Sequence, residues 1–562
     1  MRLRFLPFAI LGVVAASACS DPLNVQNTNN PDVDRVLSTP DGIEGLFRSS
    51  YQQVHSATHG STTALFSALQ VMSGESYATV ANFGMALRSG VPRSVIDNTR
   101  GNQTASENTR DFSLLQRNAR NIANGITALD NLIANGSSLG SASADKRARA
   151  WGHFTLGVAL GKVALVYDQA AVPSPGMPTD STPPLVPYNE VMDAALANLD
   201  LAISTANAPE GGSISIPNDW FRTEGGDAMN QAEFIQLANS FKARFRAGVA
   251  RTPAERDAVN WTQVAADAAA GIQDDVVLAL SSTAGWTMPW LSQALVNSTW
   301  SMVPPMYIGM ADTSGNFRKW ILPPIGDLSA APRLAGGDPG AFFMIHTPDD
   351  RFPAGDTRAE QRANSPAIVA QGLTDVYFRN RTDADTEGQV WGQSPYDFMR
   401  FSGYRGGNSN GPWVLMSATE ISMLRAEADM RLNPGSPTVA VTLINDSRTD
   451  HGLPPFAAGS TRETRAPNHP GGGAFSCVPQ TPTGGNRVVE CGTLWEAMKY
   501  EKRIETMFTG YGQWFMDHRG WGDLVVGTST MFPVPYQEMD ARRAEFYNSK
   551  AEWNSAAGTY SY

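Results

Sequence analysis

Acidic and basic side chains alternate on two C-terminal segments whose other residues are mainly apolar. Arg425 and Glu427 lie on the first segment, and Glu501 and Arg503 lie on the second. Two such carboxylates could act as the acid and the base of a reaction, but the neighbouring arginines would lower their pKa values and keep both ionised. Charged groups on otherwise apolar helices tolerate burial only when they are paired. We therefore predict an ion-pair network between packed helices and no catalytic residue here.

Two other segments match the sequence motif of a reactive site or of a metal-binding site but lack a feature that such a site requires. Residues 136–140 (Gly-Ser-Ser-Leu-Gly) match a nucleophile elbow, which needs a preceding strand, yet they follow a helical pattern ending near Ile133. Residues 383–388 begin like a calcium loop, but its twelfth position is Ser394 instead of glutamate. We predict a Gly/Ser linker and an acidic surface loop, with no metal site. A glycoside hydrolase needs only two well-placed carboxylates, so that alternative stays open.

The first of the three cysteines stands at the end of a segment with the pattern of an export signal. Cys19 directly follows the small residues 15–18, after a basic start and a short apolar run over residues 5–16. This order is typical of a secretory signal. The cysteine resembles the lipidated cysteine of bacterial lipoproteins, although Ala16 stands where a leucine is usual. We predict a signal peptide over residues 1–18 and lipidation of Cys19.

The other two cysteines, Cys477 and Cys491, form an even pair. The loop between them is rich in turn-forming residues and can bring its ends together. In the oxidising compartment that an export signal implies, we predict a disulfide bond between them. Two free thiols are the alternative.

The overall charge of the 562-residue chain limits its partners. The net charge is −11, which makes nucleic acid a poor partner, since such binding requires basic patches. It also argues against binding to anionic lipid surfaces. No long apolar segment follows the signal, so we expect contact with a membrane through the lipid anchor alone.

Helical periodicity defines the elements that must position these groups. Apolar residues recur every three to four positions in several stretches, and Thr39 can cap the first helix. The stretch 145–167 is apolar on several faces, so we expect it to be deeply buried. Helices are predicted from Thr39 onward and at 111–133, 145–167, 188–206, 231–251, 261–272, 417–432, 437–450 and 494–508.

The pattern predicts a mainly α fold. Neighbouring helices carry small residues at close-contact positions, which resembles a loose tetratricopeptide array. From residue 278 to residue 411 the periodicity fades while proline, glycine, aspartate and aromatic residues become frequent. We predict a tetratricopeptide-like helical-repeat scaffold with long loop-rich insertions, and an irregular helical bundle is the alternative.

The C-terminal third carries a recurring set of motifs. A helix with an Arg-Ala-Glu-Ala core (420–428) is followed by Asn-x-x-Arg before a glycine (445–452). A charged helix (501–505) then leads to an aromatic-Asp-x-Arg-x-Trp-Gly turn (514–522), and a Pro-hydrophobic-Pro segment follows (532–535). This order resembles the SusD/RagB-like family of nutrient-uptake lipoproteins.

Two further positions bear on this resemblance. Tyr167-Asp168 stands where the family has a tyrosine-aspartate turn after a helix. Residues 510–513 (Gly-Tyr-Gly-Gln) replace the usual acidic-Gly-x-Arg, which puts the local ion pairing in doubt. The similarity is weakest between residues 211 and 411.

The resemblance implies a SusD-like α-superhelix and a division of the chain. A lipidated N-terminus and tether would span residues 19–38, and a SusD-like helical region would span 39–277. A SusD/RagB-like region would span 278–562, with a loop-rich, ligand-facing segment at 278–411.

The resemblance also implies a function without covalent chemistry or a cofactor. Family members are anchored by lipid at the surface of the outer membrane, where they cover a TonB-dependent transporter of the SusC type. They capture an oligosaccharide, or sometimes another nutrient, and deliver it to that transporter. We expect the same location, transporter partner and ligand class for this chain.

Sugar capture requires aromatic faces that stack on pyranose rings and polar groups that bond the hydroxyls. Such side chains gather in the loop-rich segment and in one earlier loop. Most tryptophans are largely buried, and aromatic platforms also suit protein interfaces, so a purely protein-binding helical scaffold is a second alternative. The candidate ligand-binding residues are Trp286, Trp290, Trp300, Tyr307, Trp320, Arg318, Asn316, Tyr77, Arg88 and Trp391.

Overall fold

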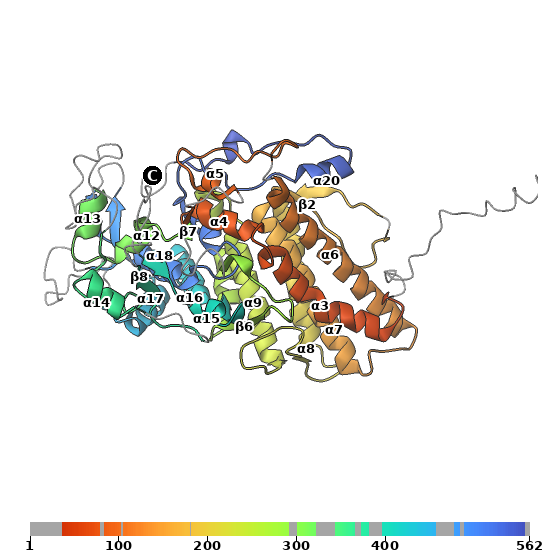
Figure 1. Ribbon diagram of the computed structural model, residues 1–562. Coiled ribbons are helices and arrows are strands. Elements are labelled where there is room, and N and C mark those ends of the chain that lie inside the picture. Colours follow the sequence, from red (N-terminus) through yellow and green to blue (C-terminus); the bar gives the residue numbers. More distant parts are fainter. Residues whose placement is uncertain are drawn as a thin grey trace, which may run out of the picture.

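The computed structural model shows a mainly α protein with a few short strands (Figure 1). Its long helices lie side by side in one half of the molecule, and shorter helices and loops fill the other half. The structure describes residues 36–78, 84–102, 105–179, 181–291, 301–321, 343–365, 372–381, 396–456, 477–483 and 488–556.

The N-terminal half is an array in which successive long helices pack on one another. Helix α3 contacts α6 and α7, α6 contacts α7, α7 contacts α8, α8 contacts α9, and α9 contacts α11. This succession is the packing pattern of a helical-repeat scaffold. The helices are α3 (Pro40–His59), α6 (Ala105–Ala134), α7 (Ala142–Val166), α8 (Tyr188–Asn207), α9 (Gln231–Gly248) and α11 (Trp261–Ala269).

Helix α7 lies at the centre of this array and is buried along nearly its whole length. Small residues allow the close packing that the sequence predicted. A Cβ atom on Gly161 would lie only 2.1 Å from the ring of Phe245, and one on Gly157 would lie 2.8 Å from the carbonyl oxygen of Ala195. Neighbouring helices could not approach α7 this closely with larger residues there.

Side-chain caps fix where several helices begin. The Thr39 hydroxyl accepts a hydrogen bond from the Gly42 amide at 3.2 Å, as the sequence predicted. Ser141 caps α7 in the same way, and Asn230 and Glu233 form a reciprocal capping box at the start of α9. Each cap satisfies amide groups that have no partner within the helix.

The C-terminal helices extend the array. Helix α16 packs on α9 and α11 from the first half and on its own neighbours α17 and α18. The fold-class prediction of a mainly α helical-repeat scaffold is therefore confirmed. These helices are α16 (Ala418–Leu432), α17 (Thr438–Asp450), α18 (Leu494–Thr506) and α19 (Gln513–Trp521).

The segment 514–522, predicted as a turn, is instead helical. It belongs to α19, which begins after Gly512 and ends at Gly522. Both glycines have positive φ angles, 68° and 79°, so the chain turns at the two ends of the motif and not within it.

The loop-rich segment 278–411 is closed at its base by two strands. Strand β6 (Val276–Ser281) pairs with β10 (Asn410–Met416) in antiparallel register, so the two ends of the segment lie side by side. The predicted boundary at residues 277 and 278 falls inside β6. The remaining strands are β1 (Tyr77–Ala78), β2 (Gln169–Ala171), β3 (Leu185–Pro187), β4 (Ser215–Ile216), β5 (Met229–Asn230), β7 (Ser301–Met302), β8 (Phe378–Asn380), β9 (Tyr396–Phe398), β11 (Gln480–Thr483) and β12 (Val488–Cys491).

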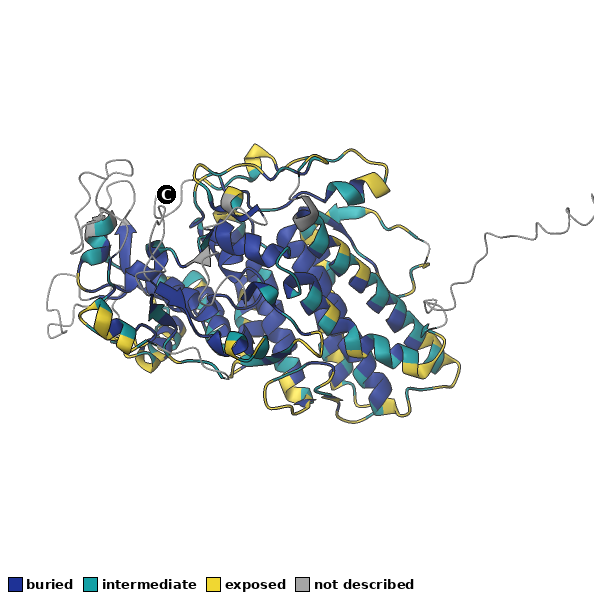
Figure 2. Cartoon of the chain, in the orientation of Figure 1, coloured by how far each residue is buried: buried dark blue, intermediate teal, exposed yellow. Residues whose placement is uncertain are grey.

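The main hydrophobic core crosses between the two predicted regions. It includes Phe47 and Trp151 from the helical array together with Trp413 and Phe515 from the C-terminal part. Figure 2 shows the buried residues running through the long helices into the C-terminal helices. The shorter helices around this core are α4 (Leu65–Ser73), α5 (Met85–Ser89), α10 (Pro253–Asp257), α12 (Pro305–Ile308), η3 (Gly309–Ala311), α13 (Asn316–Ile321), α14 (Arg358–Ala363), α15 (Ser402–Gly406), α20 (Tyr536–Ala541) and η5 (Ala551–Trp553).

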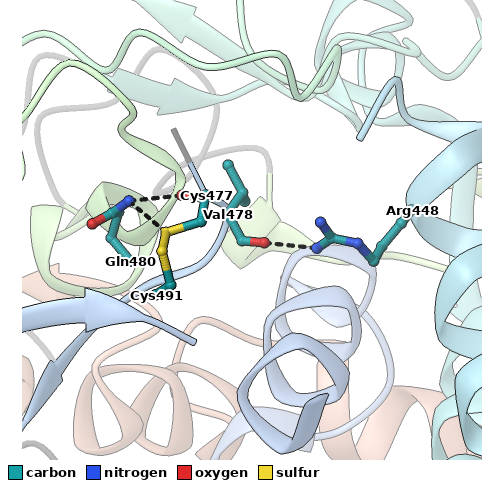
Figure 3. The surroundings of a disulfide bond; sticks show 5 residues. All are labelled: Arg448, Cys477, Val478, Gln480 and Cys491. Carbon is teal, nitrogen blue, oxygen red and sulfur yellow. Dashed lines mark hydrogen bonds between the residues drawn. A yellow bond between two sulfur atoms is a disulfide. The ribbon is translucent and has the colours of Figure 1, made fainter. Parts of the chain in front are cut away.

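The disulfide prediction is confirmed. Cys477 and Cys491 are bonded, with their Cα atoms 5.6 Å apart, at the hairpin of β11 and β12 (Figure 3). The Gln480 side chain donates to the Cys477 carbonyl at 2.8 Å, and Arg448 donates to the Val478 carbonyl at 2.7 Å. Arg448 is the arginine of the Asn-x-x-Arg motif, which here connects α17 to the disulfide hairpin.

The predicted signal peptide, Cys19 and most of the tether lie outside the described residues. Among the residues that are described, no helix combines the length and the apolar character of a membrane span.

Candidate ligand-binding site

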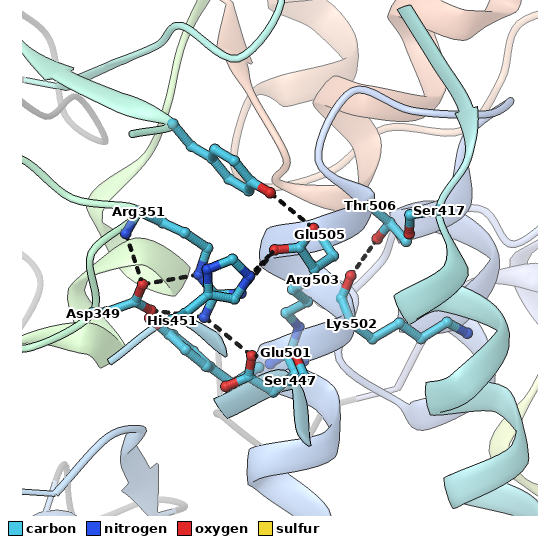
Figure 4. Close-up of polar contacts among 12 residues, drawn as sticks. Asp349, Arg351, Ser417, Ser447, His451, Glu501, Lys502, Arg503, Glu505 and Thr506 are labelled. Carbon is cyan, nitrogen blue, oxygen red and sulfur yellow. Dashed lines mark hydrogen bonds and ion pairs between the residues drawn. The ribbon is translucent and has the colours of Figure 1, made fainter. Parts of the chain in front are cut away.

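The charged residues of α18 belong to a buried ion-pair network (Figure 4). Arg351 contacts Asp349 at 2.7 Å, Glu501 at 3.1 Å and Glu505 at 3.0 Å. Burial alone would raise the pKa of Glu505, but Arg400 and the other cations around it hold that pKa well below its usual value. A carboxylate in this state stays ionised and is a poor proton donor.

The Arg-Ala-Glu-Ala helix contributes a second cluster of charges to this part of the core. Arg256 bonds both carboxylate oxygens of Glu427, at 2.9 and 2.6 Å, and contacts Asp517 at 3.2 Å. Burial opposes ionisation of Glu427, yet Arg256 lowers the pKa of its carboxyl to about 2. Lys502 completes the cluster through Asp517 at 2.8 Å.

The predicted network is thus confirmed for three of its four residues. Glu427 and Glu501 have the partners described above, and Arg503 pairs with Asp523. Arg425 is the correction, because it is only half-buried and makes no ion pair among the described residues. It lies on a different face of α16 from Glu427, whose side chain is fully buried.

The tyrosine-aspartate and Pro-hydrophobic-Pro motifs meet in space. Asp168 accepts a hydrogen bond from the Val534 amide at 3.1 Å and another from the Tyr547 hydroxyl at 2.8 Å. Tyr167 forms a β-bridge with Phe532. These two motifs therefore connect distant parts of the fold.

Three of the predicted ligand-binding residues line one apolar cavity of about 110 Å³. They are Tyr77, Tyr307 and Trp320, which come from three separate elements. The cavity reaches the surface, because Val91 on its wall is 57% exposed. Its other lining residues are Val71, Gly74, Ser76, Ser89, Arg93, Pro304, Pro305, Met306 and Val525.

Strand pairing and a tight helix end bring these aromatic residues together. Strand β1 pairs with β7, with Tyr77 opposite Met302, so Tyr77 lies beside the segment that leads into α12. Helix α4 ends at Gly74 in the left-handed conformation, with φ of 75°. A Cβ on Gly74 would lie 3.0 Å from the Tyr307 ring, so glycine serves both the turn and the close approach.

The two aromatic residues from the loop-rich segment differ in exposure. Tyr307 is only 4% exposed, and its hydroxyl donates to the Asp523 carbonyl at 2.9 Å, so it forms a fixed wall. Trp320 is half-buried and stacks on Phe317, with ring centres 6.2 Å apart. Of these two residues, Trp320 is therefore the better placed to meet a ligand.

Three polar side chains interrupt the apolar wall. The hydroxyl oxygens of Ser76 and Ser89 are buried and have no hydrogen-bond partner among the described residues. The Nε of Arg93 is likewise buried without a partner, while its other nitrogens donate to the carbonyls of Arg88 and of Met72, the latter at 3.5 Å. Burial lowers the pKa of Arg93 to about 10, so it remains a cation at neutral pH.

A second, smaller cavity of about 30 Å³ shares Arg93 with the first. Its wall includes Arg88, which donates to the Asn108 side chain at 2.8 Å, and Asp97, whose carboxylate accepts from the Thr99 amide at 2.9 Å. The predicted ligand residue Arg88 therefore lies next to the aromatic cavity and not on its wall.

The remaining predicted ligand residues are not brought to this cavity. Trp286 and Trp290 are 2% and 1% exposed, and the Trp290 indole donates to the Gln70 side chain at 2.7 Å. Both pack in the core, because their large apolar surfaces are better accommodated there than on a loop. Asn316 and Arg318 are half-buried on α13, and Asn316 donates to the Met344 carbonyl at 3.1 Å. Trp300 and Trp391 lie outside the described residues.

Sequence reasoning missed the polar part of the site. Arg93 follows a short helix in a proline-containing turn, and nothing in its neighbours along the chain marks it as unpaired. Ser76 and Ser89 are common residue types at element ends. Only the convergence of α4, α5 and α12 makes them a group, and that convergence depends on contacts between residues far apart in the sequence.

The described residues that line the aromatic cavity include no carboxylate. Within the described ranges, no group of three or more histidine, cysteine or acidic residues could hold a metal ion. The Gly-Ser-Ser-Leu-Gly motif is an exposed connection between α6 and α7, as predicted, and the calcium-like segment at 383–394 lies outside the described ranges.

No known protein-family model matches this sequence, and no curated protein matches it. Among solved structures, a SusD superfamily protein from Bacteroides vulgatus is similar at 12% identity and a TM-score of 0.48, covering 92% of this chain and 99% of that one. Another, from Parabacteroides distasonis, has 11% identity and a TM-score of 0.48, with 90% and 97% covered. A laminarin binding SusD-like protein has 12% identity and a TM-score of 0.48, with 90% and 98% covered. These neighbours bear the name of the family that the sequence motifs resemble.

Proposed function

We propose that this chain is a SusD-like, lipid-anchored protein that binds an oligosaccharide and delivers it to a TonB-dependent, SusC-like transporter. The proposal combines the motif resemblance with one structural observation. Tyr77, Tyr307 and Trp320, from segments far apart in the sequence, converge on one apolar cavity that reaches the surface. Aromatic faces of this kind stack on the apolar faces of sugar rings, and nearby polar groups bond the hydroxyls.

The size of the cavity indicates how such a ligand would bind. A volume of about 110 Å³ holds a few water molecules or one edge of a sugar ring. We propose that one sugar unit inserts an edge or a substituent beside Trp320, while the rest of the chain lies along the surface. No covalent step is part of this function, which agrees with a cavity wall that has no carboxylate among its described residues.

Binding to a panel of oligosaccharides tests this function. Titration calorimetry of the mature protein, with tryptophan fluorescence in parallel, should detect at least one glycan. Trp320→Ala should weaken that binding about fivefold, since stacking on an aromatic ring contributes about 1 kcal/mol. Trp495→Ala is the matched control, because Trp495 on α18 is also half-buried but packs against Arg431 of α16 and does not line the cavity.

The outcomes separate the proposal from its alternatives. No binding to any glycan would favour the protein-binding scaffold. Release of reducing ends from a glycan by the wild-type protein would favour a surface glycoside hydrolase. Equal weakening by both tryptophan variants would contradict the assignment of the site to this cavity.

The proposed location has its own test. Cys19→Ala should move the protein from the membrane fraction to the soluble fraction of cells, because a lipid anchor on Cys19 is the only membrane attachment that we propose. Protection of the wild-type protein from external protease would contradict its exposure at the cell surface. Co-purification of the wild-type protein with a large outer-membrane barrel is the expected result for the transporter partnership.

A further inference from the structure

Three polar groups on the wall of the aromatic cavity can donate hydrogen bonds to a ligand. Ser76 and Ser89 offer hydroxyl groups that bond nothing else among the described residues, and Arg93 offers a guanidinium group. Buried polar groups are rarely left unpaired, so three such groups on one wall require a reason. A ligand that supplies acceptors would provide it.

Arg93 has no acidic partner among the described residues although it lies on the wall of a cavity that reaches the surface. It makes no ion pair within the described part of the chain, and its hydrogen bonds go to the backbone carbonyls of Arg88 and Met72. The other ionisable side chains on the cavity wall are Tyr77 and Tyr307, and the wall has no carboxylate among its described residues. Asp97 lies in the adjoining small cavity and does not pair with it.

An uncompensated cation at the edge of an apolar cavity attracts an anion. The chain as a whole is acidic, with a net charge of −11, so a positive group at this one site stands against the general charge of the molecule. The guanidinium group is planar and matches a carboxylate with two parallel hydrogen bonds. The small cavity volume suits one such substituent better than a complete sugar chain.

We propose that the cavity recognises an acidic glycan, with the carboxylate of a uronic acid unit bound by Arg93, Ser76 and Ser89 and its ring packed on Trp320. The proposal rests on the proposed glycan-binding function and names the class of sugar. It makes Arg93 a specificity-determining residue that separates charged from neutral oligosaccharides.

A comparison of three probes of equal length tests this inference. The probes are an oligogalacturonate, its methyl ester and a neutral cello-oligosaccharide, each titrated into the full mature protein by calorimetry. The oligogalacturonate should bind at least tenfold more tightly than its methyl ester, because esterification removes the charge and keeps the ring. That preference should shrink as the salt concentration rises.

The protein-side test uses a charge-matched pair of variants. Arg93→Gln should weaken oligogalacturonate binding at least tenfold and leave binding of the methyl ester within about twofold. Arg48→Gln removes one exposed arginine outside the cavity and should leave both affinities unchanged. If Arg93→Gln does not fold, as judged by circular dichroism, the ester comparison on the wild-type protein still decides the question.

Each result has a distinct meaning. Equal affinity for the oligogalacturonate and its ester, or tight binding of the neutral probe alone, would overturn the acidic-glycan inference and leave the glycan-binding function in place. A preference for a sulfated oligosaccharide over the uronate would overturn the carboxylate assignment. Failure of all probes, together with failure of a wide glycan panel, would overturn the proposed function itself.

Discussion

Two parts of the core bury charged side chains in different ways. Around α18, Arg351 faces three carboxylates. Burial opposes their ionisation and raises the pKa of Glu501, but the cations around them lower the pKa of Asp349 and of Glu505. Between α3 and α7, Lys162 donates only to the Thr58 hydroxyl, at 3.2 Å, and makes no ion pair among the described residues. Burial lowers the pKa of Lys162 to about 7 and raises the pKa of nearby Asp111 to about 7.

The difference shows that burial alone does not decide whether a side chain stays charged. Where an opposite charge lies within hydrogen-bonding distance, the ion pair offsets the cost of removing both groups from water. Where no such partner exists, burial shifts the pKa in the direction that favours the neutral form of the side chain. Arg93 at the cavity wall follows the second pattern in having no acidic partner, but unlike Lys162 it lies where a ligand can supply one.

The largest effect is expected around α18, where Arg351 supplies the opposite charge for three buried carboxylates. Arg351→Met would leave Asp349, Glu501 and Glu505 buried without their shared cation, and the loss of one partner of a buried pair costs about 3–5 kcal/mol. Urea unfolding followed by circular dichroism measures this loss. A decrease below about 1 kcal/mol would mean that the network does not stabilise the fold, and the comparison would fail.

The same substitution at two lysines should have different effects. Lys502 contacts Asp517 at 2.8 Å, so Lys502→Met should destabilise the protein by about 2–4 kcal/mol. Lys162 has no such partner, so Lys162→Met should leave stability unchanged or raise it at pH 7. Equal destabilisation by both variants would remove the distinction between the two regions.

The pH dependence of stability sharpens this lysine comparison. The folded-state pKa of Lys162, about 7, is below its unfolded value, so the unfolded chain binds the extra proton between pH 7 and pH 10. Stability attributable to Lys162 therefore rises with pH across that range, by about 3 kcal/mol for a shift of this size. The difference in unfolding free energy between wild type and Lys162→Met, measured from pH 7 to pH 10, should show this rise. A difference that stays flat would mean that Lys162 is charged in the folded state at pH 10.

The disulfide bond between Cys477 and Cys491 should also stabilise the fold, and removing it should have a somewhat smaller effect. Replacing Cys477 and Cys491 together with serine should lower the free energy of unfolding by about 2–3 kcal/mol, the value for a closed loop of this length. Arg448 joins the same hairpin to α17, so the loss should appear in urea unfolding of the whole chain. Reduction of the wild-type disulfide should give a similar change, and no change in either case would contradict this role.

The helices could be predicted from the sequence because the signals that mark them are local. Apolar periodicity and caps such as Thr39 and Ser417 depend on residues within one or two turns of each other. The helices α7, α8 and α16 accordingly begin and end within a few residues of the predicted positions. Helix α19 was missed because its many aromatic and charged residues show no single apolar face.

The candidate ligand-binding site could be predicted only in part, because it depends on contacts between residues far apart in the sequence. Tyr77, Tyr307 and Trp320 could be chosen as aromatic residues in loop-rich segments, but so could Trp286 and Trp290, which the fold buries. Which aromatic residues reach a surface depends on long-range packing, such as the pairing of β1 with β7. The same holds for Arg93, whose lack of a partner is a property of its surroundings in space.

The smallest predicted effect concerns Arg425, which the sequence places in the ion-pair network and the structure does not. The pattern grouped Arg425 with Glu427, yet Arg425 is half-buried and unpaired among the described residues, while Glu427 is bonded by Arg256. Arg425→Met should therefore change the free energy of unfolding by no more than about 0.5 kcal/mol. Glu427→Gln on the same helix is the control and should cost several times more, because it leaves Arg256 with a weaker partner. A large loss in Arg425→Met would place Arg425 inside the network after all, and the boundary between paired and unpaired charges would have to be redrawn on α16.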